Sequence, residues 1–313
     1  MHPRLLRGCA RHQEDTVGGR RFPGTRCYRQ RPNDPSLCPT HGGDLLSTQT
    51  RSRSRDIVAR WVAVLLSLVA MILMMGLIDL FTLPGWVNQE YEWEVPLEAS
   101  WGALFTFFLA GAYLWVALFP RAPWPAFLQL AICTSALLVS AGAGTDWRPV
   151  AVALGVAASG LVLWLLLGAP VLPRANGPAV RRAPLTVAML GLPLWLPYAQ
   201  EAFVRSRAGV LGSITQGIEH WPVQGAVGVA MVLGSLAMAL WDDGRSLLRV
   251  SISVSAVYIG MAELAYPDRA GAMGSLLWGI GVTLWGLLVA LVVLPPTVGW
   301  HARQRSKGAA RAP

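Results

Sequence analysis

The sequence predicts an all-α fold: a polytopic helical membrane bundle with about eight transmembrane helices, preceded by a small cytoplasmic tail. First, 54% of the 313 residues are hydrophobic and only 14% are charged, whereas a soluble domain has about 25% charged residues. Second, eight long apolar runs lie between Ile57 and Pro296, with no charged residue in their middle stretches. Third, the charges are concentrated in the first 60 residues, the last dozen and the connectors, which is the membrane pattern.

The N-terminal tail carries the strongest local motif. Ten residues separate Cys27 from Cys38, and two more separate Cys38 from His41, while Cys9 and His12 have the same two-residue gap. Zinc prefers four thiolate or imidazole ligands in a tetrahedron. A two-residue gap lets both members of a pair reach one ion from a tight turn. Five candidate ligands therefore compete for four places.

The Cys-x10-Cys-x2-His half of this motif resembles the small Cys3His zinc motifs of the WRC type. By that resemblance, the zinc ligands are Cys9, Cys27, Cys38 and His41, with His12 as an alternative ligand. The chain departs from the WRC pattern in its longer first gap and in having Arg26 where the family has a signature Trp. The resemblance implies a zinc-ribbon-like module over residues 1–45, without implying DNA binding. We recognise no family in the membrane portion.

The alternative for the tail is a set of unrelated cysteines in a disordered, Arg-rich segment. The tail has few large apolar residues and cannot pack a core unaided, so metal binding is one of the few ways in which it could fold. A cytoplasmic location disfavours disulfides. Residues 46–56 follow as a flexible basic linker, whose arginines favour anionic lipid headgroups.

The membrane domain is expected over residues 57–300, followed by a basic cytoplasmic tail over 301–313. A transmembrane helix needs about 20 apolar residues. The predicted spans are 57–82, 99–119, 124–144, 149–172, 184–200, 222–241, 249–266 and 272–297. Glycines in the sixth and eighth spans are expected to let helix backbones approach closely. Serines at the start of the seventh span are assigned to packing rather than to a pore.

The fifth predicted span is interrupted by Pro184, Pro193 and Pro197. Each interior proline removes a backbone hydrogen bond. A broken helix can line a transporter's binding site, but a kink that neighbouring helices tolerate is the favoured interpretation. Residues 200–221 are then expected to form an outer amphipathic or re-entrant segment.

The distribution of Arg and Lys predicts the orientation. With the N-terminus in the cytoplasm, the inner connectors and the C-terminal tail hold ten basic residues. The outer connectors hold four, namely Arg148, Arg205, Arg207 and Arg269. Because basic residues favour the cytoplasmic side, we expect a multi-pass protein of the cell membrane with both termini in the cytoplasm. This topology also explains the net charge of +9, so nucleic acid is not an expected partner.

Three acidic residues near the predicted outer ends of the spans are candidate ligand-binding residues: Asp79, Glu98 and Glu263. Ionisable groups at bilayer depth are often functional, and these three could form an outer vestibule with Arg148 or His220. For most of these residues the favoured alternative is solvated interface charge, with Glu263 paired to an arginine or to water. Asp79 and Glu263 are the exceptions, because each is flanked by apolar residues on both sides and has a desolvation cost. The alternation of acidic and aromatic residues over 90–98 also suggests a short extended strand or an interfacial segment.

The sequence disfavours an enzyme without excluding one. It contains no His-Glu-x-x-His, Gly-x-Ser-x-Gly or P-loop motif, and no span carries paired carboxylates. We therefore expect a non-enzymatic scaffold or sensor, with membrane lipids around it, zinc in its tail and a cytoplasmic protein partner recruited by that tail. The alternative is a permease or transporter subunit with an outer-face acidic vestibule. An outer-face enzyme acting on a lipid-linked substrate ranks last, and the sequence predicts no oligomeric state.

Overall fold

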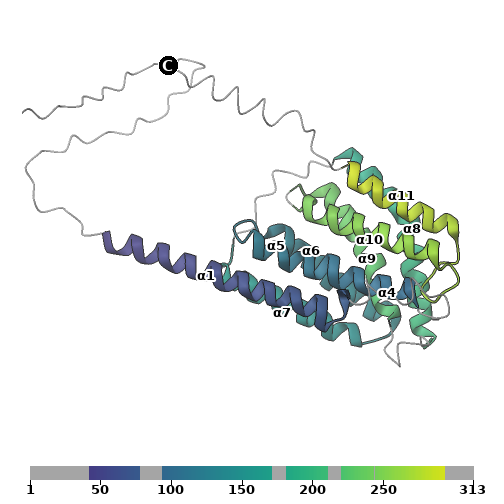
Figure 1. The fold of residues 1–313 in the computed structure, drawn as a ribbon, viewed down its shortest axis with the longest axis horizontal. Helices are drawn as coiled ribbons and strands as arrows, with labels where there is room; N and C mark the ends of the chain where they lie inside the picture. The colour runs from purple at the N-terminus through teal and green to yellow at the C-terminus, as the bar shows by residue number, and fades with distance from the viewer. Residues whose placement is uncertain (1–41, 78–93, 171–180, 211–219, 243, 293–313) are drawn as a thin grey trace, which may run out of the picture. The chain divides into compact units, whose positions relative to one another are not determined.

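The computed structural model describes residues 42–77, 94–170, 181–210, 220–242 and 244–292. The chain divides into two compact units, Met1–Leu46 and Ser47–Pro313, and the helical bundle belongs to the second. The described residues contain no β-strand. Their helices are α1 (Gly42–Leu68), η1 (Val69–Leu73), α4 (Val95–Gly102), η2 (Ala103–Ala110), α5 (Gly111–Leu118), α6 (Trp124–Gly144), α7 (Arg148–Leu166), α8 (Arg182–Arg207), α9 (Trp221–Leu240), α10 (Arg245–Ala265) and α11 (Leu276–Val292) (Figure 1).

Six of the described helical runs are long and apolar enough to cross a membrane. They are Ser54–Leu73, Val95–Leu118, Trp124–Gly144, Arg148–Leu166, Trp221–Leu240 and Arg245–Ala265. The prediction of an all-helical, multi-pass membrane protein is therefore confirmed at this level. The predicted count of eight spans is not confirmed. The fifth predicted span corresponds to α8, which carries charges at both ends. The eighth corresponds to α11, a shorter apolar helix.

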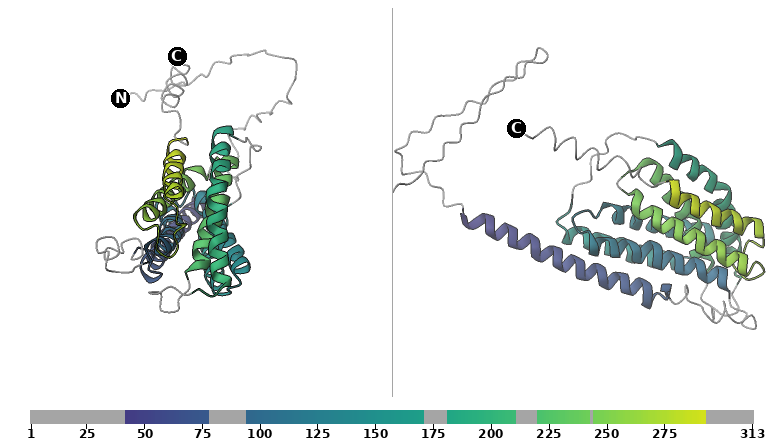
Figure 2. Two further views of the ribbon diagram at one scale, coloured as in Figure 1. Left: turned by 90° about the vertical axis from the view of Figure 1, so that its right-hand side faces the viewer. Right: turned by 45° about the horizontal axis from the view of Figure 1, so that its top comes forward.

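Two rows of helices pack against each other within this unit. In one row, α7, α6, α9 and α8 lie next to each other in that order. The other row contains η1, then the continuous helical run of α4, η2 and α5, then α10 and α11. Contacts between the rows join α6 to η2, α9 to α10 and α8 to α11. Figure 2 shows α10 and α11 in one layer and α8 in the other. The buried core lies mainly between the rows.

The structure corrects two local predictions. Residues 95–98 form the first turn of α4 rather than an extended strand, with Pro96 in the first turn, where its fixed φ favours a helix start. Residues 90–93 of the predicted strand lie outside the described part. Residues 200–207 belong to α8, so the predicted separate segment after residue 200 is wrong there, and residues 211–219 are not described.

Helix α8 runs unbroken through Pro193 and Pro197. Neighbouring helices support it, because Gly228 of α9 lies so close that an added Cβ would be 2.8 Å from Ala199 Cβ. The same close packing joins α11 to α10, where a Cβ on Gly286 would lie 2.8 Å from Ala256 Cβ. Glycines thus let helix backbones approach, as the sequence predicts.

A wide helical turn in the second span is stabilised by side chains from two other helices. In the π-helix η2, the Phe108 carbonyl accepts a hydrogen bond from Gln129 Nε2 at 2.6 Å. The Ser251 hydroxyl donates to the Phe107 carbonyl at 2.8 Å. At this position, Ser251 therefore has a packing role in the helix interface, in agreement with the sequence-based assignment.

Candidate functional site at one end of the bundle

One end of the bundle gathers buried polar side chains from several helices. Glu98 lies on α4, His220 immediately precedes α9, and Glu263 lies near the end of α10. All three are buried, and Glu263 is only 1% exposed. We call this region the Glu98 end. It is formed where α4, α9 and α11 begin and where α6, α8 and α10 finish.

Glu98 is paired with His220, one of its predicted neighbours. Its Oε1 atom lies 3.4 Å from His220 Nδ1. The Trp101 ring packs edge-on against the imidazole, with ring centroids 4.3 Å apart. The carboxylate is therefore in close contact with a titratable ring inside the fold rather than solvated at the interface.

Glu263 has a different role from either predicted one. Its carboxylate accepts hydrogen bonds from the backbone amides of Met273, at 2.9 Å, and Ser275, at 3.2 Å. The structure therefore replaces the predicted arginine or water partner with two main-chain donors. Because a buried carboxylate needs such donors, Glu263 anchors the connector that leads into α11.

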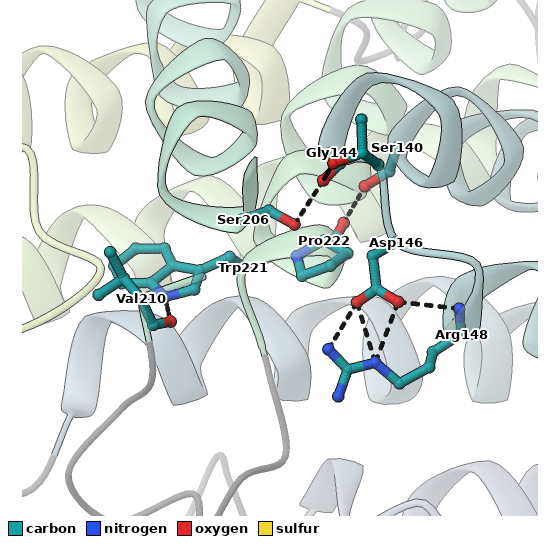
Figure 3. Close-up of polar contacts among 9 residues, drawn as sticks. Ser140, Gly144, Asp146, Arg148, Ser206, Val210, Trp221 and Pro222 are labelled. Atoms are coloured by element: carbon teal, nitrogen blue, oxygen red, sulfur yellow. Dashed lines mark hydrogen bonds and ion pairs between the residues drawn. The ribbon is translucent and has the colours of Figure 1, made fainter. Parts of the chain in front are cut away.

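The remaining predicted site residues are not brought to this place. Arg148, the first residue of α7, forms an ion pair at 2.7 Å with Asp146 on the connector between α6 and α7 (Figure 3). Asp79 lies outside the described residues, as do all the predicted zinc ligands: Cys9, His12, Cys27, Cys38 and His41. Within the described ranges, no group of three or more His, Cys, Asp or Glu could hold a metal ion.

An aromatic cluster lies beside the buried polar groups. Tyr198 and Trp278 stack with centroids 5.0 Å apart, and Trp195 contacts both of them and Trp285 edge-on. The Tyr198 hydroxyl is hydrogen-bonded to Ser100. This cluster joins α8 to α11 and fixes the orientation of the tyrosine.

Figure 3 shows how the ends of α6, α8 and α9 are tied together. Ser140 donates a hydrogen bond to the Pro222 carbonyl, and Ser206 donates to the Gly144 carbonyl at 3.0 Å. The Trp221 indole donates to the Val210 carbonyl at 2.8 Å. These bonds hold the helix ends in a fixed arrangement next to a cavity.

That cavity is an open pocket of about 500 Å³ at the same end. Its wall is formed by the ends of α8 and α9 and by the connector between α10 and α11. Its polar lining side chains are Glu201, Arg205, Gln224, Asp268 and Arg269. Neither Glu98 nor Glu263 lines it, so the predicted carboxylates support the region without facing the cavity.

Sequence reasoning missed Asp268 and Arg269 as candidate site residues. The run from Pro267 to Gly274 carries the only signal that could have found them, because paired glycines between two apolar helices indicate a shaped turn. Gly271 and Gly274 indeed have positive φ, at 88° and 65°. The convergence of this turn with α8 and α9 could not be read from spacing alone.

A second cavity is apolar. It has a volume of about 410 Å³. Its walls come from η1, from the helical run of η2 and α5, and from α7. Tyr113 and Ser159, whose hydroxyls lie 2.6 Å apart, provide its polar side-chain groups.

The opposite end of the bundle carries basic residues held by one acid. Arg245 is buried and donates through Nε to the Met238 carbonyl at 2.8 Å, and it also pairs with Asp242. Arg181 pairs with the other oxygen of Asp242 at 2.9 Å. The two ends therefore differ in chemistry: one holds fixed arginines, and the other holds buried carboxylates and an open pocket.

Comparison with known proteins gives no relative. No family, no curated protein and no solved structure is significantly similar to the chain.

Proposed function

We propose that the chain is a non-enzymatic membrane scaffold or sensor whose N-terminal tail binds zinc and recruits a cytoplasmic protein. The supporting observation is that the two described candidate carboxylates are held in structural contacts, Glu98 with His220 and Glu263 with two backbone amides. The Cys and His residues of the tail are then the best remaining candidates for chemistry.

Metal analysis of the full-length protein tests this proposal. We expect about one zinc per chain, since a tetrahedral site takes four protein ligands. Cys27→Ala and Cys38→Ala should each abolish the bound zinc, whereas Cys133→Ala, which removes a buried thiol of α6, should keep it. Absence of zinc from the purified protein, or its persistence in both tail variants, contradicts the proposal.

The proposed topology places both termini in the cytoplasm. A membrane-impermeant thiol reagent added to intact cells should modify Asp268→Cys, at an exposed position of the Glu98 end, and leave Asp243→Cys unmodified. The reverse pattern would show that the bundle is inserted the other way round. Modification at both positions would contradict the membrane arrangement itself.

A permease subunit is the second candidate, and the open pocket at the Glu98 end favours it. Transport requires a water-accessible path beyond that pocket to the middle of the bundle. Ser251 is 2% exposed and lies at the interface of α10 with η2. Labelling of Ser251→Cys by a small hydrophilic thiol reagent would favour the permease, and protection would favour the scaffold or sensor.

A further inference from the structure

The apolar cavity beside α7 is open to the medium around the bundle. Ala151 and Gly155 on its α7 wall are exposed, and Leu66 and Val69 on the opposite wall are partly exposed. The two spans that carry these walls are each only 22% buried. We call this cavity the α7 groove. Its walls can be reached from outside, and in a membrane the medium that reaches them is lipid.

The lining of the α7 groove suits an apolar occupant. Among the described residues that line it, none is charged. The hydroxyls of Tyr113 and Ser159 lie 2.6 Å apart. Ser159 donates its proton to the Val156 carbonyl at 2.9 Å, so Tyr113 is the donor to Ser159. Both hydroxyl protons are therefore used inside the protein, and a polar occupant would lose its hydration without gaining a donor.

The α7 groove has the depth of one bilayer leaflet. Helix α7 begins at Arg148, next to the exposed ring of Trp147, and a Trp beside a charged residue is typical of a membrane interface. Ala151 lies three residues and Ser159 eleven residues beyond Arg148, which is about 5 and 16 Å along the helix. Since the hydrocarbon core is about 30 Å thick, the groove runs from below the interface to the middle of the bilayer.

Hydrogen bonds between helices fix the walls of the groove. Ser67 of α1 donates to the Ala110 carbonyl of η2 at 3.2 Å. The Trp101 indole of α4 donates at 2.7 Å to the carbonyl of Met74, directly after η1. The Tyr113 hydroxyl joins α5 to α7. The groove is therefore shaped before any ligand arrives, and preorganised walls reduce the ordering cost of binding.

A hydrocarbon chain fits the α7 groove better than a further helix does. Ala151, Gly155 and Ser159 recur every four residues, a pattern that lets helices pair closely. The opposite wall, however, carries the large side chains of Leu66 and Val69. A helix, about 10 Å in diameter, could enter only by displacing that wall, whereas a single lipid chain is far narrower. An empty groove would forfeit dispersion contacts along all its walls.

We propose that the α7 groove binds one acyl chain of a phospholipid from the leaflet at the Glu98 end. The chain lies between Ala151 and Gly155 on one side and Leu66 and Val69 on the other, with its headgroup at the level of Trp147. Recognition is by the chain, because the described lining offers no charge to a headgroup. All residues of the site belong to the bundle, so the site does not depend on the zinc tail.

Native mass spectrometry of the delipidated full-length protein in a maltoside detergent tests the proposal with three probes. They are dioleoyl phosphatidylcholine, dioleoyl phosphatidylglycerol and dihexanoyl phosphatidylcholine. Both dioleoyl lipids should form a saturable one-to-one adduct, because they share their chains. The dihexanoyl lipid should bind at least about tenfold more weakly, since its short chains bury less apolar surface. No saturable adduct, an adduct with only one of the two dioleoyl headgroups, or equal binding of the dihexanoyl lipid overturns the proposal.

Variants of α7 assign the adduct to the groove. Gly155→Phe should abolish it, because the ring would occupy space where no atom lies within 4 Å of a built Cβ. Ala151→Phe, at a second exposed position of the same wall, should abolish it too. Ala157→Phe adds the same ring to an exposed position of α7 that does not line the groove. This matched control should keep the adduct.

Two results with these variants overturn the proposal. The first is an adduct that persists in both groove variants. The second is a wild-type dimer that forms no lipid adduct and that Gly155→Phe dissociates, because the groove would then hold a second copy of the chain.

Photo-crosslinking of the wild-type protein gives a test without variants. Nanodiscs of dioleoyl phosphatidylcholine carry a small fraction of an analogue with a diazirine midway along one acyl chain, and mass spectrometry maps the labelled residues. We expect labels on Val69 and Val152, which line opposite walls of the groove, as well as on Leu161, which is 55% exposed outside it. Labels on Leu161 without any on Val69 or Val152 overturn the proposal.

Discussion

Helices α1 and α7 differ from α9 and α10 in a way that apolarity alone does not reveal. Of the six candidate membrane spans among the described residues, the two most apolar, Ser54–Leu73 in α1 and η1 and Arg148–Leu166 in α7, are only 22% buried, whereas those in α9 and α10 are 67% and 61% buried. α7 presents Leu154, Leu161 and Leu165 outward, and each is more than half exposed. Helices α9 and α10 instead bury serines, glycines and glutamine.

The difference follows from the solvent. Lipid tails are as apolar as leucine, so no hydrophobic force drives one apolar helix surface against another in a membrane. Close packing and hydrogen bonds decide which helices lie inside, and small or polar residues provide both. The peripheral helices are those whose large apolar side chains suit contact with lipid.

The largest expected effect comes from adding volume to the inner region. Gly228→Val would place side-chain carbons against Ala199 and the Trp195 carbonyl, which lie 2.8 and 3.0 Å from a built Cβ. We expect a loss of about 3 kcal/mol in the free energy of unfolding, measured by SDS titration in mixed micelles.

The matched control is Gly155→Val on α7, where no atom lies within 4 Å of a built Cβ. Its effect should be within about 0.5 kcal/mol of zero. Equal losses at the two glycines would remove the distinction between inner and peripheral helices.

A second pair of variants tests the distinction within one peripheral helix. Leu163 of α7 is fully buried, and Leu161, two residues earlier, is 55% exposed. Leu163→Ala should cost about 2 kcal/mol through the cavity that it leaves. Leu161→Ala should change the same SDS unfolding free energy by less than about 0.5 kcal/mol, because lipid fills the space. A larger loss at Leu161 would mean that another protein surface covers α7.

A third variant addresses the buried charge. Glu263→Gln replaces one acceptor oxygen by an amide NH2 group, which cannot accept from the second backbone donor. We expect a loss of about 1.5 kcal/mol, seen as a lower unfolding temperature in detergent. Asp56→Asn on α1 is the control and should leave the unfolding temperature unchanged. A neutral Glu263→Gln would show that the carboxylate does not anchor the connector.

The smallest expected loss of unfolding free energy comes from removing one serine hydroxyl. This loss should be nearly the same in the inner helix α10 and in the peripheral helix α7. Ser251→Ala removes the bond to the Phe107 carbonyl, and Ser159→Ala on α7 removes the bond to Tyr113. Each should cost about 0.6 kcal/mol by SDS titration, the average for a hydrogen bond between membrane helices. A much larger loss at Ser251 would assign the stability of the inner region to polar contacts rather than to packing.

The candidate site could be predicted only in part. Glu98, Glu263 and His220 were recognisable because charged or polar side chains near apolar runs need partners. Their partners were not all recognisable, since Glu263 is satisfied by backbone amides that carry no sequence signal. Asp268 and Arg269 resembled ordinary connector residues until the turn was seen beside Gln224. The proposed zinc ligands of the tail stay a prediction.

By itself, the sequence determined the helical class, the membrane as solvent and the places where glycines permit close packing. These properties depend on local composition, because a backbone in lipid must satisfy its own hydrogen bonds. The tertiary structure decided which helices are inner, that α8 continues through its prolines, and that the pocket is lined by Gln224 and Asp268 rather than by Glu98 and Glu263. These properties depend on contacts between residues far apart in the chain, and a pattern of apolar runs holds no record of which runs are neighbours.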